Sequence, residues 1–130
     1  MELRFTVWQF VRLMVHIEEN ATPPKQLKSL HVAWSDVWQP LDAELSELAE
    51  RDFDAFSDLM MDQDVVIEDA TNEQAAVAQQ AVNEIMATMD RAIEEGGRTE
   101  TTHENSEHIQ NLKFERRELR QLSRKLGRIE

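Results

Sequence analysis

Hydrophobic side chains recur every three or four residues along most of this chain, which is the spacing of amphipathic helices. The first helix is predicted at about residues 7–19, since Thr6 and Gln9 match a capping box at its start. Phe5 and Phe10 flank that cap as a hydrophobic staple. Apolar residues cover most of the circumference of this helix, so we expect it to be the central and most buried helix.

Two short segments allow either a strand or a helix. Residues 1–7 alternate apolar and polar side chains as a strand does, although they lead directly into the first helical pattern. Residues 65–67, with the sequence Val-Val-Ile, match a short strand or the end of a preceding helix. The sequence alone leaves both alternatives open.

A second helical pattern begins at Thr22-Pro23-Pro24, where Thr22 is a cap residue followed by proline in the first turn, and it continues well past Pro40. Proline in a helix interior removes a backbone hydrogen bond, so Pro40 predicts a kink or an end at this point. Because the pattern resumes directly afterwards, one bent helix and two separate helices are both compatible with it. A third helical pattern follows Thr71 or Asn72, either of which can cap a long Ala-rich helix.

The last helix is set apart from the rest of the chain. The Ala-rich helix is expected to stop at Gly96 and Gly97, and residues 98–102 are a polar connector. We therefore predict a single all-α domain, a bundle of four to six helices with a long amphipathic C-terminal helix. This domain consists of an acidic helical core over residues 1–97, the connector over residues 98–102, and a basic amphipathic helix over residues 103–130.

This C-terminal helix carries an apolar stripe bordered by arginines. Leucines recur one heptad apart along the stripe, which is typical of a helix that packs along another helix. Packing within the chain, pairing with a second copy and docking on another protein are all open for it. The predicted contact stripe is Ile109, Leu112, Leu119, Leu122, Leu126 and Ile129, and the arginines beside it include Arg116, Arg120 and Arg124.

Charge is sorted along the chain. Residues 36–73 hold thirteen acidic residues and one basic residue, whereas residues 111–130 hold seven basic residues and three acidic ones. Asp54, Asp58 and Asp62 stack at i, i+4 spacing, where like charges repel unless something neutralises them. One interpretation is a solvated face. The other places the basic C-terminal helix, from the same chain or a second copy, against these carboxylates.

Aromatic and methionine side chains are assigned to the core. Trp8, Trp34 and Trp38 occur at helical spacing among other apolar residues, where burial is the usual outcome. Met60 and Met61 are flexible fillers that also suit adaptable binding surfaces. Core packing is the default prediction for them.

The composition limits the possible functions. With 130 residues the chain suffices for one domain with a real core, and it contains no cysteine, which excludes disulfides and thiol chemistry. The formal net charge of −12 makes direct binding to nucleic acid unfavourable, because such binding depends on Lys and Arg. The N-terminal apolar run is interrupted by polar residues and matches neither a signal peptide nor a membrane span. We therefore expect a cytoplasmic protein with no membrane partner.

Candidate chemistry is sparse. His16 and His31 lie among apolar residues, where a hydrogen-bonded packing role is expected. Only one Glu-x-x-His unit is present where a dinuclear metal site needs two, and no phosphate loop or nucleophile elbow occurs. The strongest metal-ligand candidates are Glu100, His103, Glu104 and Glu107. We expect no catalytic residue, no cofactor and no metal.

The favoured hypothesis is a non-catalytic adaptor, assembly factor or regulator that self-associates through its helices as a homodimer, or that binds another protein. In it the apolar stripe makes the contact, and the arginines set its orientation against acidic residues of the 36–73 region. One alternative is an acidic inhibitor that mimics nucleic acid and blocks a basic partner surface. Another is a helical metalloprotein.

Overall fold

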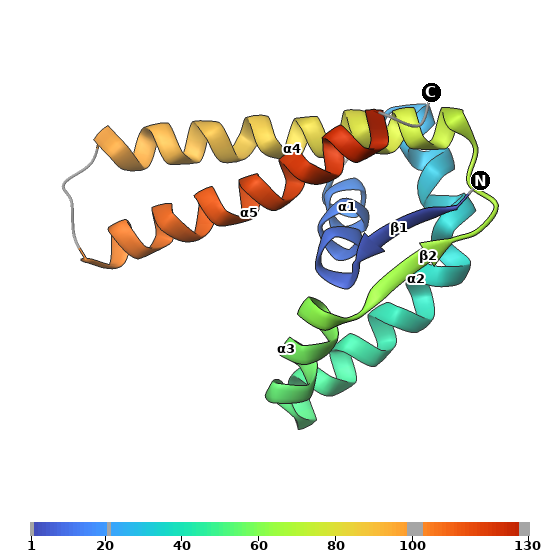
Figure 1. The fold of residues 1–130 in the computed structure, drawn as a ribbon, viewed down its shortest axis with the longest axis horizontal. Helices are drawn as coiled ribbons and strands as arrows, with labels where there is room; N and C mark the ends of the chain where they lie inside the picture. Colours follow the sequence, from blue (N-terminus) through green and yellow to red (C-terminus); the bar gives the residue numbers. More distant parts are fainter. Residues whose placement is uncertain (1, 21, 99–102, 128–130) are drawn as a thin grey trace.

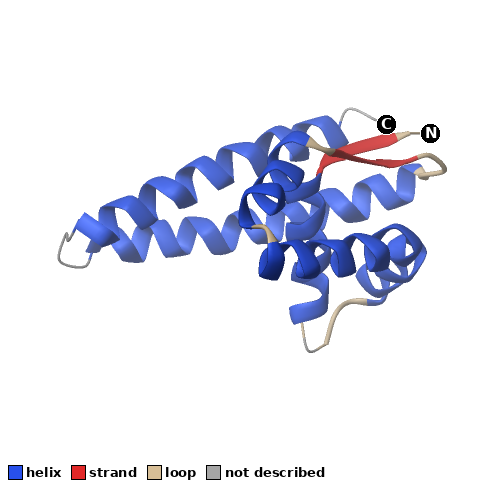
Figure 2. Ribbon diagram, turned by 90° about the horizontal axis from the view of Figure 1, so that it is seen from below, coloured by secondary structure: helices blue, strands red, loops and turns tan. Residues whose placement is uncertain are grey.

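The computed structural model describes residues 2–20, 22–98 and 103–127, with side chains placed for 2–20, 22–95 and 110–127. Over these residues the chain forms five helices and one pair of short strands (Figures 1 and 2). The elements are β1 (Leu3–Thr6), α1 (Val7–Glu19), α2 (Lys25–Arg51), α3 (Phe53–Asp62), β2 (Asp64–Ile67), α4 (Asn72–Arg98) and α5 (His103–Gly127). The predicted all-α class is confirmed, and the strand pair adds to it.

α1 lies at the centre of the fold, as predicted. Thr6 Oγ1 accepts a hydrogen bond from the Gln9 backbone N–H at 3.1 Å, and Gln9 Oε1 accepts one from the Thr6 N–H at 3.0 Å. The ring centroids of Phe5 and Phe10 lie 5.8 Å apart, so the staple forms as well. α1 then packs against both strands and all four other described helices. A helix that is apolar around most of its circumference is buried in this way.

Both ambiguous segments form strands. β1 and β2 pair antiparallel, with Leu3 opposite Ile67 and Phe5 opposite Val65. These four side chains are buried, whereas the residues that alternate with them are not, as expected for a half-buried sheet. The pairing joins the start of the chain to its middle and places the end of α3 beside the start of α1 (Figure 1).

Pro40 does not end the second helix. α2 runs through it, and Figure 1 shows α2 changing direction along its length, as expected where a proline removes a backbone hydrogen bond. The break falls instead at Asp52, whose extended backbone closes α2 and opens α3. Its carboxylate accepts a hydrogen bond from the Ala55 N–H at 3.1 Å. The stretch is therefore two helices, divided twelve residues beyond the proline.

The aromatic core lies where α1 meets α2 and the strand pair. The Phe10 ring centroid lies 6.2 Å from that of Trp34 and 6.0 Å from that of Trp38, and all three side chains are buried. Phe5 completes the cluster at 5.7 Å from Trp34. Core packing is confirmed for these four residues, whereas Trp8 is only half-buried.

α4 and α5 form a long antiparallel pair that extends beyond the rest of the fold (Figure 1). α4 has 27 residues and is therefore about 40 Å long at 1.5 Å per residue. Thr71 is its cap, since its hydroxyl oxygen accepts a hydrogen bond from the Gln74 N–H at 3.0 Å. The predicted stop at Gly96 and Gly97 is wrong by a residue or two, because α4 ends at Arg98.

Two limbs therefore diverge from the core. One is the α4–α5 limb, and the other is the α2–α3 limb, formed by the second half of α2 together with α3 (Figure 1). The start of α1 lies in the angle between them. This arrangement exposes more helix surface than a closed bundle would.

Candidate interaction surfaces

The predicted contact stripe of α5 packs against its own chain. Leu119, Leu122 and Leu126 are only 0–3% exposed, because α5 lies against α4 and α1. Leu112 is half-buried against the same core. Ile109 and Ile129 lie outside the side chains that the structure describes. Leu119, Leu122 and Leu126 are therefore not available for an association between folded copies of this chain.

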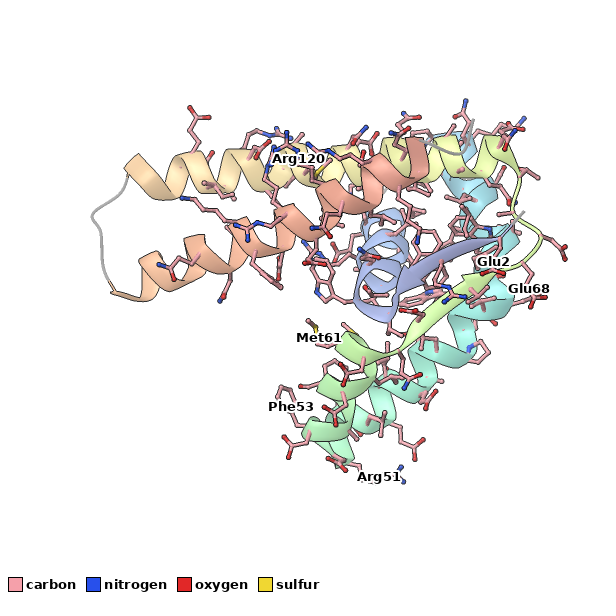
Figure 3. All side chains as sticks on the ribbon, viewed as in Figure 1. Glu2, Arg51, Phe53, Met61, Glu68 and Arg120 are labelled. Carbon is pink, nitrogen blue, oxygen red and sulfur yellow. The ribbon has the colours of Figure 1, made fainter. Side chains whose placement is uncertain are left out.

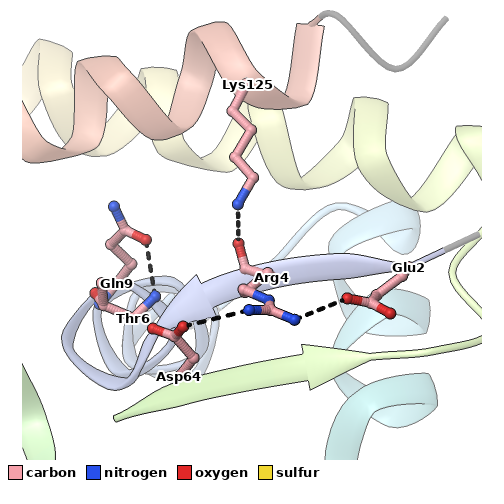
Figure 4. Close-up of polar contacts among 6 residues, drawn as sticks. All are labelled: Glu2, Arg4, Thr6, Gln9, Asp64 and Lys125. Atoms are coloured by element: carbon pink, nitrogen blue, oxygen red, sulfur yellow. Dashed lines mark hydrogen bonds and ion pairs between the residues drawn. The ribbon is translucent and has the colours of Figure 1, made fainter. Parts of the chain in front are cut away.

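Polar bonds also hold α5 in this position. The Ser123 hydroxyl is buried among the leucines and donates to Asn83 Oδ1 at 2.7 Å, while Gln79 Nε2 donates to the Ser123 carbonyl at 2.9 Å. Lys125 Nζ donates to the Arg4 carbonyl at 2.7 Å, which ties the end of α5 to β1 (Figure 4). Because buried polar groups need partners, these bonds favour one register of α5 on α4.

A basic stripe runs along the solvent-facing side of α5. It consists of Lys113, Arg117, Arg120 and Arg124. The four residues are spaced by four, three and four positions, which places them on one side of the helix, and all are exposed. Among the described residues, none of the four forms an ion pair. Arg116 differs, since it is half-buried and pairs with Asp90 of α4.

An acidic side of α3 is formed by Asp54, Asp58 and Asp62, which are all exposed. No described residue forms an ion pair with any of the three carboxylates. Pairing of the C-terminal arginines with this region in the same chain is thus not seen in the described part of the structure. Arg116 uses Asp90 instead, which lies outside residues 36–73. Both charged surfaces face solvent, and Figure 3 shows Arg120 on α5, well separated from α3.

A groove lies in the angle between the two limbs, and we call it the corner groove. It has a volume of about 320 Å³ and is walled by α1, α3 and α5. Phe114 and Met61 are 49% and 57% exposed there; Figure 3 shows Met61 extending from α3 into this angle. The groove is lined by Thr6, Trp8, Met60, Met61, Asn111, Phe114, Glu115 and Glu118. The charged side chains of this lining are both glutamates.

Contacts between α1 and α5 shape the wall of the corner groove. The Arg12 guanidinium lies 6.0 Å from the Trp8 ring centroid and 3.9 Å from the Glu115 carboxylate. Gln9 Nε2 donates to the Glu118 carbonyl at 3.4 Å. The Glu118 carboxylate itself has no ion-pair partner in the described part of the chain.

The corner groove was not predicted from sequence. The default core assignment is wrong for Met61, which is exposed, and Met60 is only half-buried. Phe114 falls outside the leucine stripe of α5, and a large apolar residue off the buried face of an amphipathic helix is the sequence signal that could have indicated it. That signal identifies one exposed residue without identifying what lies beside it.

A larger hollow, of about 500 Å³, lies between the starts of α2 and α4. Its lining includes Lys25 and Glu73, one charge of each sign, among polar and small apolar side chains. Such a mixed lining has no shared chemistry that would select a ligand. The corner groove is therefore the more distinctive of the two.

The two N-terminal histidines have the hydrogen-bonded packing role that was predicted. His16 Nε2 lies 3.1 Å from Glu84 Oε2, and His31 Nε2 lies 3.0 Å from Glu18 Oε1. Glu18 also accepts a hydrogen bond from Trp38 Nε1 at 2.6 Å. These bonds link α1 to α4 and to α2.

The predicted metal-ligand candidates Glu100, His103, Glu104 and Glu107 lie outside the described side chains. Among the side chains that are described, no group of three or more His, Asp or Glu residues is placed to hold a metal ion. None of the described helices combines the length and the hydropathy needed to cross a membrane.

Comparisons with known proteins add no assignment. Neither a family model, nor a curated protein, nor a solved structure matches this chain. The charged surfaces and the corner groove are the features of this chain that bear on function.

Proposed function

We propose that this chain is a non-catalytic interaction protein that self-associates, with the basic stripe of one copy against the acidic side of α3 in another. A single observation carries the proposal: both surfaces are exposed, opposite in charge, and unpaired with each other among the described residues. Charge complementarity of this kind steers partners together and sets their orientation.

The two surfaces also agree in length. The basic stripe covers twelve positions, from Lys113 to Arg124, whose ends lie about 16 Å apart along the helix. The acidic side covers nine positions, from Asp54 to Asp62, whose ends lie about 12 Å apart along the helix. A helix-to-helix contact could therefore match most of the charges of one surface with those of the other.

The pairing suits a twofold symmetric dimer. Each copy carries one basic and one acidic surface, so a twofold axis repeats the same contact twice. The non-catalytic part of the proposal rests on His16 and His31, the two histidines whose side chains are described. Each bonds a glutamate, and no described hydroxyl bonds either ring. We assign the chain no reaction.

The test is the solution mass of the full chain by light scattering at low and at high salt. We expect a dimer at low salt that dissociates as salt screens the contact. Substitutions at the buried Leu119 and Leu126 would disturb the fold, so the variants that test the dimer change exposed residues. The double variant Arg120→Glu/Arg124→Glu should be monomeric at both salts, whereas Lys28→Glu, an exposed change on α2, should leave the dimer intact.

A mixing experiment makes the test specific. Asp54→Lys/Asp58→Lys should also be monomeric alone, because its acidic side becomes basic. Mixed with Arg120→Glu/Arg124→Glu, it should form a heterodimer, since both contacts are then complementary again. A wild-type monomer at low salt, or a dimer that survives the arginine variant, would contradict the proposal.

A second candidate function rests on the exposed carboxylates of α3. An unneutralised stack of Asp54, Asp58 and Asp62 also suits an inhibitor that occupies the nucleic-acid site of a basic protein. In that case the chain stays monomeric at low salt, and replacing the three residues by Asn removes its binding to the basic protein. Unchanged thermal unfolding would show that the variant is folded.

A further inference from the structure

The corner groove contains apolar side chains of α1, α3 and α5. The proposed dimer contact uses other side chains of α3 and α5. Phe114 and Met61 are about half exposed, and Trp8 and Met60 are half-buried beside them. Single exposed apolar side chains are ordinary, but a concave cluster of them is typical of a binding site. Two of the four are methionines, whose flexible thioethers adapt to the shape of an apolar partner.

The shape of the groove favours an elongated partner. It opens in the angle between two helical limbs, with α3 on one side, α5 on the other and the start of α1 as its floor (Figures 1 and 3). Its volume of about 320 Å³ is enough for a few inserted side chains of such a partner. A helix laid into such a groove inserts side chains spaced three or four residues apart.

Charge selects which helix would fit. The lining contains Glu115 and Glu118 and contains no Lys or Arg. The Glu115 carboxylate lies 3.9 Å from Arg12, but the Glu118 carboxylate has no ion-pair partner among the described residues. α3, the opposite wall, has acidic residues and no basic one. Carboxylates beside apolar side chains in a groove are complementary to apolar anchors flanked by Lys or Arg.

We infer that the corner groove binds one basic amphipathic helix of a different protein, with its apolar residues against Phe114, Met61 and Trp8 and its cations beside Glu118. This partner contact is separate from the self-association proposed above and does not depend on it. It would make the chain an adaptor with two surfaces, one for its own copy and one for a second protein.

The experiment uses a labelled peptide with Leu on one helical face and Lys on the other, and measures its affinity for the full chain by fluorescence anisotropy. Phe114→Ala should weaken binding about tenfold, as expected for an aromatic anchor in an interface. The matched control is Phe53→Ala, which removes an exposed ring of α3 outside the groove lining and should change the affinity by less than about twofold.

A second matched pair separates the groove from the overall acidic charge of the chain. Glu118→Gln and Glu50→Gln change the net charge equally, but Glu50 is an exposed residue of α2 outside the groove. Glu118→Gln should weaken binding several-fold more than Glu50→Gln. Equal losses in either pair, equal binding of a Leu/Glu peptide, or no binding at all would overturn the inference.

Peptide binding to the corner groove can be tested separately from the proposed dimer. The monomeric variant Arg120→Glu/Arg124→Glu keeps every groove residue and should still bind the peptide. If Phe114→Ala instead makes the wild-type dimer monomeric, a second copy occupies the groove and the inference is wrong. Because Phe114 is about half exposed, its replacement should leave the unfolding transition nearly unchanged, which circular dichroism checks.

Discussion

α1 and α3 are alike in sequence character but differ in burial. Both are short and predominantly apolar, and both begin at a side-chain cap, Thr6 for α1 and Asp52 for α3. α1 has neighbours on every side and buries most of its apolar residues, whereas none of the residues of α3 is fully buried. Hydrophobicity therefore determines that each helix packs, but its position in the fold determines how many of its sides are covered.

Because of this difference in burial, α1 contributes mainly to the stability of the fold, whereas α3 offers apolar surface for recognition. The apolar residues of α1 form the core, where each of them contributes to the free energy of unfolding. On α3, Phe53 stacks on Phe56 at 5.8 Å between ring centroids yet remains 68% exposed, and Met61 borders the corner groove. The apolar surface of α3 is thus available to a partner.

The largest expected effect comes from the centre of α1. Phe10→Ala removes a fully buried ring that packs against Trp34 and Trp38, and we expect a loss of about 3–5 kcal/mol in the free energy of unfolding. The counterpart on α3, Phe53→Ala, should cost about 0.5 kcal/mol or less. Urea unfolding followed by circular dichroism measures both. Similar losses would mean that α3 is as buried in solution as α1.

The next effect concerns the leucine stripe of α5. Leu119→Ala should cost about 2–5 kcal/mol, since Leu119 is fully buried in its own chain. The loss should be the same at low and high protein concentration, because an intrachain contact does not depend on association. Leu112→Ala, at a half-buried position, should cost less. A loss that changes with protein concentration would place Leu119 between copies.

The two helix caps extend the comparison to smaller effects. Thr6→Ala and Asp52→Ala should each cost about 1 kcal/mol of helix stability. The former should lower global stability, because α1 unfolds only with the core, whereas the latter should increase local opening of α3. Amide hydrogen exchange separates the two outcomes. Global destabilisation by Asp52→Ala would show that α3 unfolds together with the core.

The smallest effect is expected at the exposed methionine of α3. Met61→Gln should change the free energy of unfolding by no more than about 0.5 kcal/mol, because this side chain lies at the surface. Met14→Gln makes the same chemical change in α1, where the side chain is fully buried, and should cost several times as much. Denaturant midpoints of the two variants provide the measurement.

Local signals predicted a large part of this fold. The helix predicted at 7–19 matches α1, and Thr6 and Thr71 bond as helix caps, whereas the predicted cap at Thr22 is wrong because α2 begins at Lys25 with no side-chain cap. These features depend on residues within one turn of each other, so adjacent sequence contains all the information they need. Pro40 shows the limit of such signals, because tertiary packing keeps α2 helical through a residue that disfavours a helix.

The sequence by itself thus determined the helical class, the starts of α1, α4 and α5, and the separation of acidic from basic segments. Only the tertiary structure decided that residues 3–6 pair with 64–67, that the leucines of α5 pack internally, and that Trp8, Met61 and Phe114 meet in one groove. Each of these results joins residues from different elements that lie far apart in the sequence. Such contacts depend on how all the apolar faces are buried together, and no local pattern encodes that choice.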